Sequence, residues 1–433
     1  MNEWRILPLE DCMAAIIDYR GKSPEKTAFG VPLVTAKIVK GGRIEKPEEF
    51  IAEADFDDWM RRGMPKPRDI VMTTEAPLGE VAQLDGRKVA LAQRVTTLRG
   101  KPEILDNTFL KFLLQSHPVQ EELRARATGT TVLGIRQSEL RKVSLNLPPL
   151  PEQKAIAAVL GALDDKIELN RRMNATLEAM ARALFQSWFV DFDPVRAKLD
   201  GRPPAALDPA TAALFPDSFQ DSALGEIPHG WVVCPLSEKI QLLSGGTPKT
   251  SEPTYWDGDI PWYSVRDAPS ETDVWVIHTD KHVTKLGIAN SAAQVFPEKT
   301  TIISARGTVG KLALTAVPMA MNQSCYGVRG ITGYGDYFTY YSLREATAQL
   351  QQRTHGTVFD TITTETFKTL DCIFPTPKIT AAFDNLVEPL LGQIRANLHQ
   401  SRTLTTLRDT LVPKLLSGEL SVNQRMEGAL ADA

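Results

Sequence analysis

Cysteine is scarce in this chain of 433 residues. The 4 cysteines are Cys12, Cys234, Cys325 and Cys372. They lie far apart and form no C-x-x-C pair, so neither a disulfide framework nor a zinc ribbon is predicted, and a reducing cytoplasm is expected. No apolar run reaches the roughly 18 residues that a membrane span needs. The first residues are charged rather than apolar, unlike a secretory signal.

Motifs for catalysis and cofactor binding are also missing. No Walker A sequence, no G-x-G-x-x-G after a predicted strand, no H-E-x-x-H and no G-x-S-x-G occurs. His278 and His282 have i, i+4 spacing, but they follow a β-like run with no third ligand nearby, so no metal site is predicted. We therefore expect no catalytic residue, although a triad assembled in space would leave no such motif.

Positive charge is not in excess. The chain has 49 Lys plus Arg against 53 Asp plus Glu, for a formal net charge of −4. This balance excludes a uniformly basic coat for nucleic acid, but it leaves room for a local basic surface. By segment, the net charge is +2 in 1–150, −1 in 151–200, −4 in 201–378 and −1 in 379–433.

The sequence does contain a repeat the size of a whole domain. One constant shift of the sequence against itself matches Trp4 with Trp231, Pro8 with Pro235, Arg126 with Arg353, Gly129 with Gly356 and Pro148 with Pro375. Each half has short β-rich runs between Gly and Pro turns, and an amphipathic helix at 109–115 or 337–352. The predicted fold class is α/β (α+β), with compact irregular sheets in two domains, 1–150 and 231–378.

A long helix is predicted after each domain, over 151–190 and 379–420. Apolar positions alternate steps of three and four, which is the period of a coiled-coil seam. The main seam positions are Leu163, Ile167, Asn170, Leu177, Leu184, Leu390, Ile394, Asn397, Leu404 and Leu411. A buried Asn in a seam fixes the helix register at some cost in stability. A helix packed only on its own domain would show a similar stripe, but two ungapped copies favour an antiparallel pair.

The remaining segments are predicted to be irregular. Residues 191–230 are rich in Pro, Ala and Asp, which predicts an extended linker without a helix. Residues 421–433 are small and polar, which is typical of a flexible tail.

Together these features resemble the specificity subunit of type I restriction–modification enzymes. The strongest matches are 148–153 (PPLPEQ), 187–195 (SWFVDFDPV) and 415–420 (LLSGEL), at the ends of the long helices. Residues 245–248 (GGTP) resemble the entry of a family recognition domain. Residues 74–79 (TEAPLG) and 306–310 (RGTVG) resemble its central turn. The resemblance covers nearly the whole chain.

The resemblance implies a non-catalytic subunit whose two recognition domains each read one half of a bipartite site in double-stranded DNA. The paired helices would hold the spacing and dock two methyltransferase subunits, and the motor-nuclease restriction subunits would join them. This chain would need no cofactor, whereas its partners would use S-adenosylmethionine, ATP and Mg²⁺. A helix over 152–190 spans about 58 Å, or roughly 17 base pairs, which bounds that spacing.

Candidate DNA contacts lie in turn-rich segments that repeat. Arg and Lys can bond guanine edges or phosphates, and Asn and Gln can bond adenine. The candidates are Arg20, Lys22, Lys37, Gln93, Arg94, Thr247, Lys249, Arg266, Arg306, Asn322 and Gln323. Each could instead be a solvated surface residue or could stabilise a turn. Trp4 and Trp231 are expected in the cores.

The two central turns differ in sequence. The second domain has Ser304-Ala305-Arg306-Gly307 where the first has Thr74-Glu75-Ala76-Pro77. The halves should therefore read different sequences, which makes the site asymmetric. Because the net charge is low, weak DNA binding is expected of the chain alone.

Two other functions stay open at this point. A fused nuclease or methyltransferase would need a clustered acidic–Lys site or an N/D-P-P-Y/F motif, and neither is found. A coiled-coil scaffold that binds only protein would have no evident need for two divergent globular domains.

Overall fold

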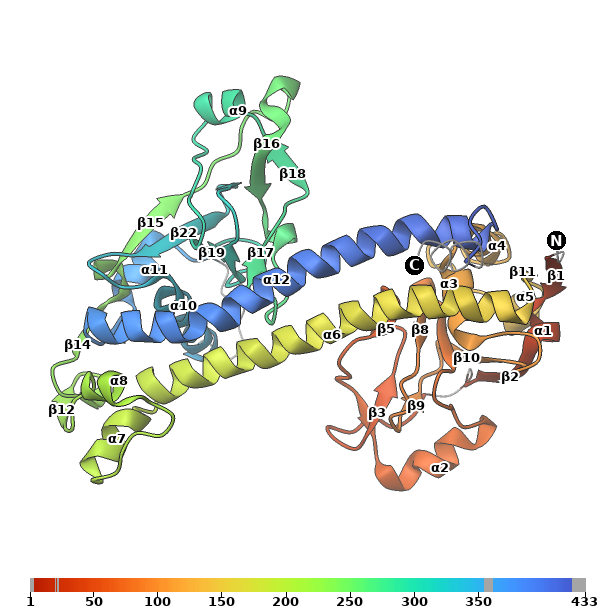
Figure 1. Cartoon of the computed structure of the whole chain (residues 1–433), viewed down its shortest axis with the longest axis horizontal. Coiled ribbons are helices and arrows are strands. Elements are labelled where there is room, and N and C mark those ends of the chain that lie inside the picture. Colours follow the sequence, from red (N-terminus) through yellow and green to blue (C-terminus); the bar gives the residue numbers. More distant parts are fainter. Residues whose placement is uncertain (1–3, 20, 22, 354–360, 423–433) are drawn as a thin grey trace, which may run out of the picture. The chain divides into compact units, whose positions relative to one another are not determined.

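The computed structural model describes residues 4–19, 21, 23–353 and 361–422 (Figure 1). The chain forms two compact units, unit 1 with Met1–Lys166 and Leu404–Ala433, and unit 2 with Ile167–Thr403. The boundary crosses both long helices, so each unit contains a segment of each. Among the described residues, no helix is both long and apolar enough to traverse a bilayer.

A four-stranded antiparallel sheet, in the order β2–β10–β7–β8, forms the centre of unit 1. Its strands are β2 (Met13–Asp18), β10 (Val95–Gly100), β7 (Ile70–Thr74) and β8 (Leu78–Gln83). Helix α3 (Asn107–Gln115) begins where the Asp106 carboxylate accepts hydrogen bonds from the amides of Thr108 and Phe109. Its buried Phe109 and Leu110 belong to the same core as Ile70 of β7.

Shorter elements complete unit 1. They are β1 (Arg5–Pro8) paired with β11 (Ser144–Leu147), β3 (Val31–Val34) between β6 (Phe50–Ile51) and β9 (Ala90–Leu91), β4 (Val39–Lys40) paired with β5 (Arg43–Ile44), the helices α1 (Leu9–Cys12), α2 (Phe56–Trp59), α4 (His117–Ala125) and α5 (Gln137–Leu140), and the 3-10 turns η1 (Glu53–Asp55) and η2 (Met60–Arg62).

Unit 2 is built around a five-stranded sheet with the order β15–β22–β19–β20–β17. Its strands are β15 (Ile240–Ser244), β22 (Cys325–Gly330), β19 (Thr301–Ser304), β20 (Leu312–Thr315) and β17 (Trp275–Val276). The other elements are β14 (Val232–Pro235) paired with β23 (Asp371–Phe374), β16 (Trp256–Tyr263) between β18 (Lys281–Val283) and β21 (Ala320–Met321), α9 (Lys285–Ala289), α10 (Asp336–Arg353), α11 (Thr364–Thr369), and the 3-10 turns η3 (Leu236–Glu238), η4 (Pro253–Tyr255) and η5 (Val265–Asp267).

The strand pairings confirm the internal repeat. The order β15–β22–β19–β20 in unit 2 reproduces β2–β10–β7–β8 in unit 1. The pair β1–β11 recurs as β14–β23, with both strands displaced by the same shift that aligns the two halves of the sequence. A parallel pair also recurs, because Leu33 pairs with Ala90 in unit 1 and Trp262 pairs with Ala320 in unit 2. The two units therefore have the same topology despite their different side chains.

The two long helices, α6 (Leu150–Phe189) and α12 (Pro377–Leu416), each have 40 residues and begin and end at equivalent positions of the repeat. At about 1.5 Å per residue, each is about 60 Å long. All ten main seam residues are buried or half-buried. Helix α12 ends shortly before Gly418, whose φ of +76° is typical of a residue that follows a helix. Val422 still packs on the core of unit 1, and 423–433 of the predicted tail lie outside the described residues.

Buried amides fix how the two helix segments pair within unit 2. Asn397 Nδ2 donates a hydrogen bond to Asn174 Oδ1 at 2.9 Å, and Asn170 Nδ2 donates to Ser401 Oγ at 3.1 Å. Asn170 precedes Asn174 in α6, whereas the partner of Asn170 follows the partner of Asn174 in α12. The two segments therefore run antiparallel. The two bonds are equivalent under the repeat, since the shift that carries Asn170 onto Asn397 also carries Asn174 onto Ser401.

An ionic cluster occupies the matching place in unit 1. The Asp164 carboxylate on α6 accepts hydrogen bonds from Lys111 of α3 and from Arg408 of α12, the latter at 2.8 Å. Under the repeat, Asp164 corresponds to Leu391 and Arg408 to Ala181, both of which are fully buried. Unit 2 therefore has apolar packing where unit 1 has charges.

The connection between the halves contains more regular structure than predicted. It forms α7 (Asp193–Leu199), α8 (Pro209–Ala213) and a hairpin of β12 (Phe219–Ser222) and β13 (Gly225–Pro228). The expectation of a helix-free linker was wrong because Pro194 and Pro209 lie in the first turns of the helices, where no backbone donor is needed. Phe192 and Phe215 anchor the connection in the core of unit 2, which also contains Trp231.

The amide pair predicts a stability effect confined to unit 2. We expect Asn397→Leu to lower the free energy of unfolding by about 2 kcal/mol, because it leaves Asn174 Oδ1 buried without its donor. Tryptophan fluorescence during urea unfolding measures this, since Trp188, Trp231 and three other tryptophans of the 7 lie in unit 2. The exposed neighbour Ala396 provides the control Ala396→Leu. Equal midpoints for the two variants would contradict the assignment.

Candidate functional site

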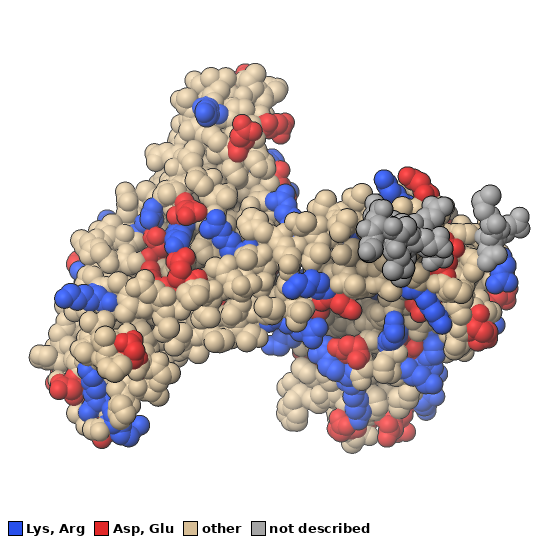
Figure 2. Space-filling view, in the orientation of Figure 1, with Lys and Arg blue, Asp and Glu red and all other residues tan. Residues whose placement is uncertain are grey.

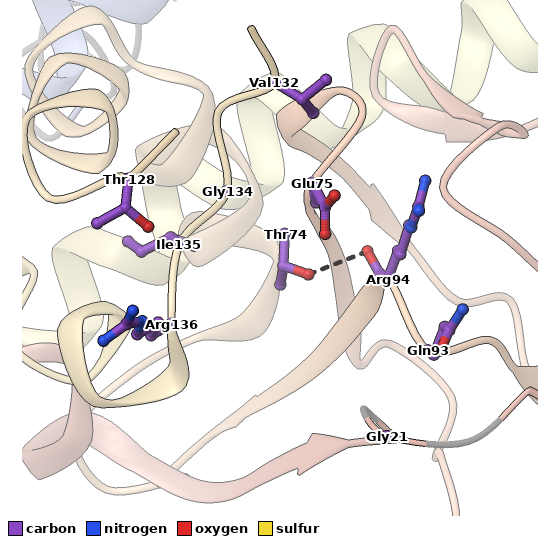
Figure 3. Close-up of a pocket in the computed structure, with 10 residues that line it drawn as sticks. All are labelled: Gly21, Thr74, Glu75, Gln93, Arg94, Thr128, Val132, Gly134, Ile135 and Arg136. Carbon is purple, nitrogen blue, oxygen red and sulfur yellow. Dashed lines mark hydrogen bonds between the residues drawn. The ribbon is translucent and has the colours of Figure 1, made fainter. Parts of the chain in front are cut away.

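A groove with a volume of about 450 Å³ lies at one end of the central sheet of unit 1 (Figure 3). Four parts of the chain form it: Gly21, the end of β7 with the residue after it, the turn between β9 and β10, and the stretch 128–136. The lining residues are Gly21, Thr74, Glu75, Gln93, Arg94, Thr128, Val132, Gly134, Ile135 and Arg136.

Backbone hydrogen bonds hold these segments together. The amide of Thr74 donates to the Arg94 carbonyl oxygen at 3.0 Å, and the Ile135 amide donates to the Thr74 carbonyl oxygen at 3.0 Å. Thr128 and Gly134 exchange two further bonds, of 2.8 and 2.9 Å. The Thr74 hydroxyl also donates to the Arg94 carbonyl oxygen (Figure 3). Since the backbone polar groups are used in this framework, the longer side chains at the rim can bind a ligand.

The rim combines one carboxylate with two guanidinium groups. Arg94 and Arg136 are exposed and Glu75 is half-buried. Within the part of the chain that the structure describes, none of these three side chains forms an ion pair or a hydrogen bond. Together with the Gln93 amide they offer donors and acceptors of the kind that recognise base edges and phosphates.

Unit 2 builds the same framework. The Ala305 amide donates to the Ser324 carbonyl oxygen at 2.8 Å, and the Ile362 amide donates to the Ala305 carbonyl oxygen at 2.9 Å. These bonds correspond to the two bonds of Thr74 in unit 1. Ala305 is therefore the structural equivalent of Thr74.

An isolated bridge in each unit identifies the next pair of equivalents. Glu75 bridges to Gly134, and Arg306 bridges to Thr361. Glu75 thus corresponds to Arg306, whereas the sequence comparison had placed Glu75 on Ala305. That prediction was wrong by one residue. It used the offset that matches Gln93 with Gln323, whereas Thr73 pairs with Val95 and Ser304 pairs with Cys325, which matches Thr73 with Ser304.

Three of the predicted contacts in unit 2 are engaged in local hydrogen bonds. The Gln323 side chain, which is equivalent to Gln93, accepts a hydrogen bond from the Thr247 hydroxyl. Asn322 Oδ1 accepts a hydrogen bond from the Ser324 amide at 3.1 Å, so this side chain stabilises the turn before β22. The fold therefore brings Thr247 and Gln323 together.

The other predicted contacts are dispersed. Lys37 and Arg266 are exposed in equivalent turns after the parallel pairs. Lys37 Nζ lies 3.3 Å from Glu48, and both side chains are 73% exposed, so this ion pair contributes little stability. Lys249 is exposed at a turn. Two predicted contacts lie outside the described residues, Arg20 and Lys22.

Sequence reasoning missed two charged groups of the groove. Glu75 lies in the central turn that the repeat identifies, so a signal existed for it. Arg136 has no such signal, because a long-range bond between Ile135 and Thr74 brings it to the rim.

Charged side chains of both signs are interspersed on unit 1, on the face that Figure 2 shows, with no single basic surface. Among the described residues, no group of three His, Cys, Asp or Glu side chains could hold a metal ion. Burial raises the pKa of Cys12 to about 11 and that of Cys325 to about 12, so both are thiols at neutral pH and weak nucleophiles.

Comparisons with known proteins give a consistent result. A family model described as "Type I restriction modification DNA specificity domain" matches residues 64–179 and 228–397. The type I restriction enzyme HindI specificity subunit of Haemophilus influenzae is 29% identical over 356 residues, which cover 72% of this chain and 77% of the relative. The MjaIX specificity subunit of Methanocaldococcus jannaschii is 27% identical over 406 residues, with coverages of 91% and 88%.

A similar fold is known from a crystal structure. The S subunit of the type I restriction–modification system of M. genitalium matches with a TM-score of 0.57 at 18% identity. The match covers 95% of this chain and 96% of the other. At this identity the likeness concerns the fold.

A substitution at Gly129 is predicted to disturb the stretch 128–136, which lines the groove. This residue has a φ of +114°, and a Cβ there would lie 2.1 Å from the Val132 carbonyl oxygen. We expect Gly129→Ala to break the Thr128–Gly134 bonds and to speed amide exchange in 126–136 by about tenfold or more. Exchange mass spectrometry measures this. Gly41→Ala is the control, because Gly41 has a φ of +54° with nothing within 4 Å of a Cβ. Equal exchange in both variants would contradict the clash.

Proposed function

This chain belongs to the type I restriction–modification DNA specificity family, and we propose that it reads an asymmetric bipartite site in double-stranded DNA, one half-site per unit. Its role is DNA sequence specificity, with two recognition domains. The two family matches fall one in each half of the sequence. The observation that carries the proposal is the repeated framework around the groove, which bears different side chains in the two units.

The difference between the units supports an asymmetric site. Gln93 and Gln323 are alike at equivalent positions, whereas Glu75 is replaced by Arg306. Two recognition domains with the same backbone and different side chains bind the same DNA shape but different bases.

The helices offer matched surfaces for two copies of one partner. Val159 and Leu407 are exposed on the helix segments of unit 1, at 36% and 45%, and Met180 and Leu386 are exposed on those of unit 2, at 49% and 40%. The repeat relates them, because the shift that aligns the two halves carries Val159 onto Leu386 and Met180 onto Leu407. Exposed apolar side chains at repeated positions favour docking of two methyltransferase subunits.

The chemistry and the phosphate contacts are assigned to partners. The chain acts as a non-catalytic subunit without a cofactor, and S-adenosylmethionine, ATP and Mg²⁺ serve the methyltransferase and restriction subunits. Its net charge of −4 supports a division in which partners supply much of the phosphate contact.

The spacing role is tested by lengthening both helices. A seven-residue insertion at equivalent positions of α6 and α12 keeps the seam in phase and adds about 10 Å, or about three base pairs. The methylated motif is mapped by sequencing DNA from cells that express the complete methyltransferase. We expect it to keep both half-sites and to have a spacer that is longer by about three base pairs. The same insertion after Gly201 is the control and should leave the motif unchanged. An altered half-site with the old spacer would contradict the role.

The docking surfaces are tested one at a time. The double substitution Val159→Asp and Leu407→Asp should remove one methyltransferase subunit from the purified complex, because it places charge on one apolar surface. Native mass spectrometry gives the stoichiometry. Thr176→Asp with Thr410→Asp, at exposed polar positions of the same helices, is the control. Retention of both subunits in the first variant would contradict this surface.

A further inference from the structure

We propose that Glu75 and Arg306 are the side chains that discriminate between bases, at equivalent positions of the two recognition domains. The two half-sites then differ in hydrogen-bond polarity at one base. Unit 1 selects a base that presents an amino group, cytosine or adenine, and unit 2 selects guanine. This inference rests on the proposed function and names the residues that make its site asymmetric.

The equivalence of the two positions comes from the backbone. Each residue directly follows the one whose carbonyl oxygen accepts the Ile135 or Ile362 amide. Each also forms the isolated bridge that closes the framework, Glu75 to Gly134 and Arg306 to Thr361. The same framework therefore presents a carboxylate in unit 1 and a guanidinium in unit 2.

The chemistry of the two groups is opposite. An ionised carboxylate only accepts hydrogen bonds, so it needs the N4 amino group of cytosine or the N6 amino group of adenine. A guanidinium only donates, and it pairs in a bidentate manner with O6 and N7 of guanine. Neither side chain has an ion-pair partner among the described residues, and Arg306 is exposed. Both are therefore available to a base edge.

Neighbouring positions compensate for the reversed charge. Arg94 precedes β10, and its equivalent before β22 is Ser324. Arg136 precedes α5, and its equivalent before α11 is Thr363. Glu75 with its two arginines carries a net charge of +1, and Arg306 with Ser324 and Thr363 also carries +1.

This compensation separates the selection of a base from the attraction to phosphate. A carboxylate close to DNA repels phosphate, and the two arginines of unit 1 offset that repulsion. The polarity of the base-selecting side chain can therefore reverse while the net charge around it stays the same in the two units. A solvated surface glutamate would need no such compensation.

The test uses the complete methyltransferase with Glu75→Gln and, separately, Arg306→Gln. Glutamine keeps the size of the glutamate side chain, but its amide both donates and accepts hydrogen bonds. It can therefore pair with a base edge that presents either a donor or an acceptor. We expect Glu75→Gln to lower discrimination about tenfold or more at one C or A of one half-site. Arg306→Gln should do the same at one G of the other half-site. Motif mapping and binding to duplexes with each base at each position measure both. Glu103→Gln, an exposed site in unit 1 outside the groove, makes the same charge change as a control.

The outcomes separate this inference from the proposed function. Relaxation at one base in one half-site per variant supports it. An unchanged motif in both variants, a uniform loss of affinity for all sequences, or relaxation at the opposite polarity would overturn it while leaving the bipartite role intact. Absence of any bipartite motif in the wild-type complex would overturn the proposed function itself. If one variant fails to fold, as judged by circular dichroism, the other still decides.

Discussion

The pairing of the α6 and α12 segments in unit 2 depends on hydrogen bonds between buried amides in their seam. Asn170, Asn174 and Asn397 are at most 3% exposed, and a buried amide without a partner is costly. Sliding one helix along the other by a heptad would place Leu390 or Leu404 opposite Asn174 in place of Asn397.

The same backbone carries two sets of side chains. Strand order, the parallel pairs and the bridges after β7 and β19 are shared, whereas the groups that project from them differ in charge. Conformation is set largely by backbone hydrogen bonds and buried apolar residues, so positions outside the core, such as Glu75 and Arg306, can diverge without changing it. A duplicated fold can in this way acquire two specificities on one framework.

Periodic features were predictable from the sequence, and long-range features were not. The whole-domain repeat and the alternating steps of three and four predicted both helices and the α/β class, because buried faces recur at regular positions. Arg136 could not be placed in the groove, since a bond between residues far apart in sequence brings it there. The equivalence of Glu75 and Arg306 needed the strand pairings and bridges, because the offset between the repeats changes along the chain. The helices of the connection were missed because proline was taken as a breaker rather than as a first-turn residue.

The two units differ in chemistry at one matched contact between their helix segments. Asp164, Lys111 and Arg408 join them by charge in unit 1, and Leu391 and Ala181 pack there in unit 2, beside a cluster rich in aromatic rings. High salt therefore weakens the ionic contact at Asp164 in unit 1 and leaves the matching apolar contact in unit 2 unchanged, although the two backbones are alike.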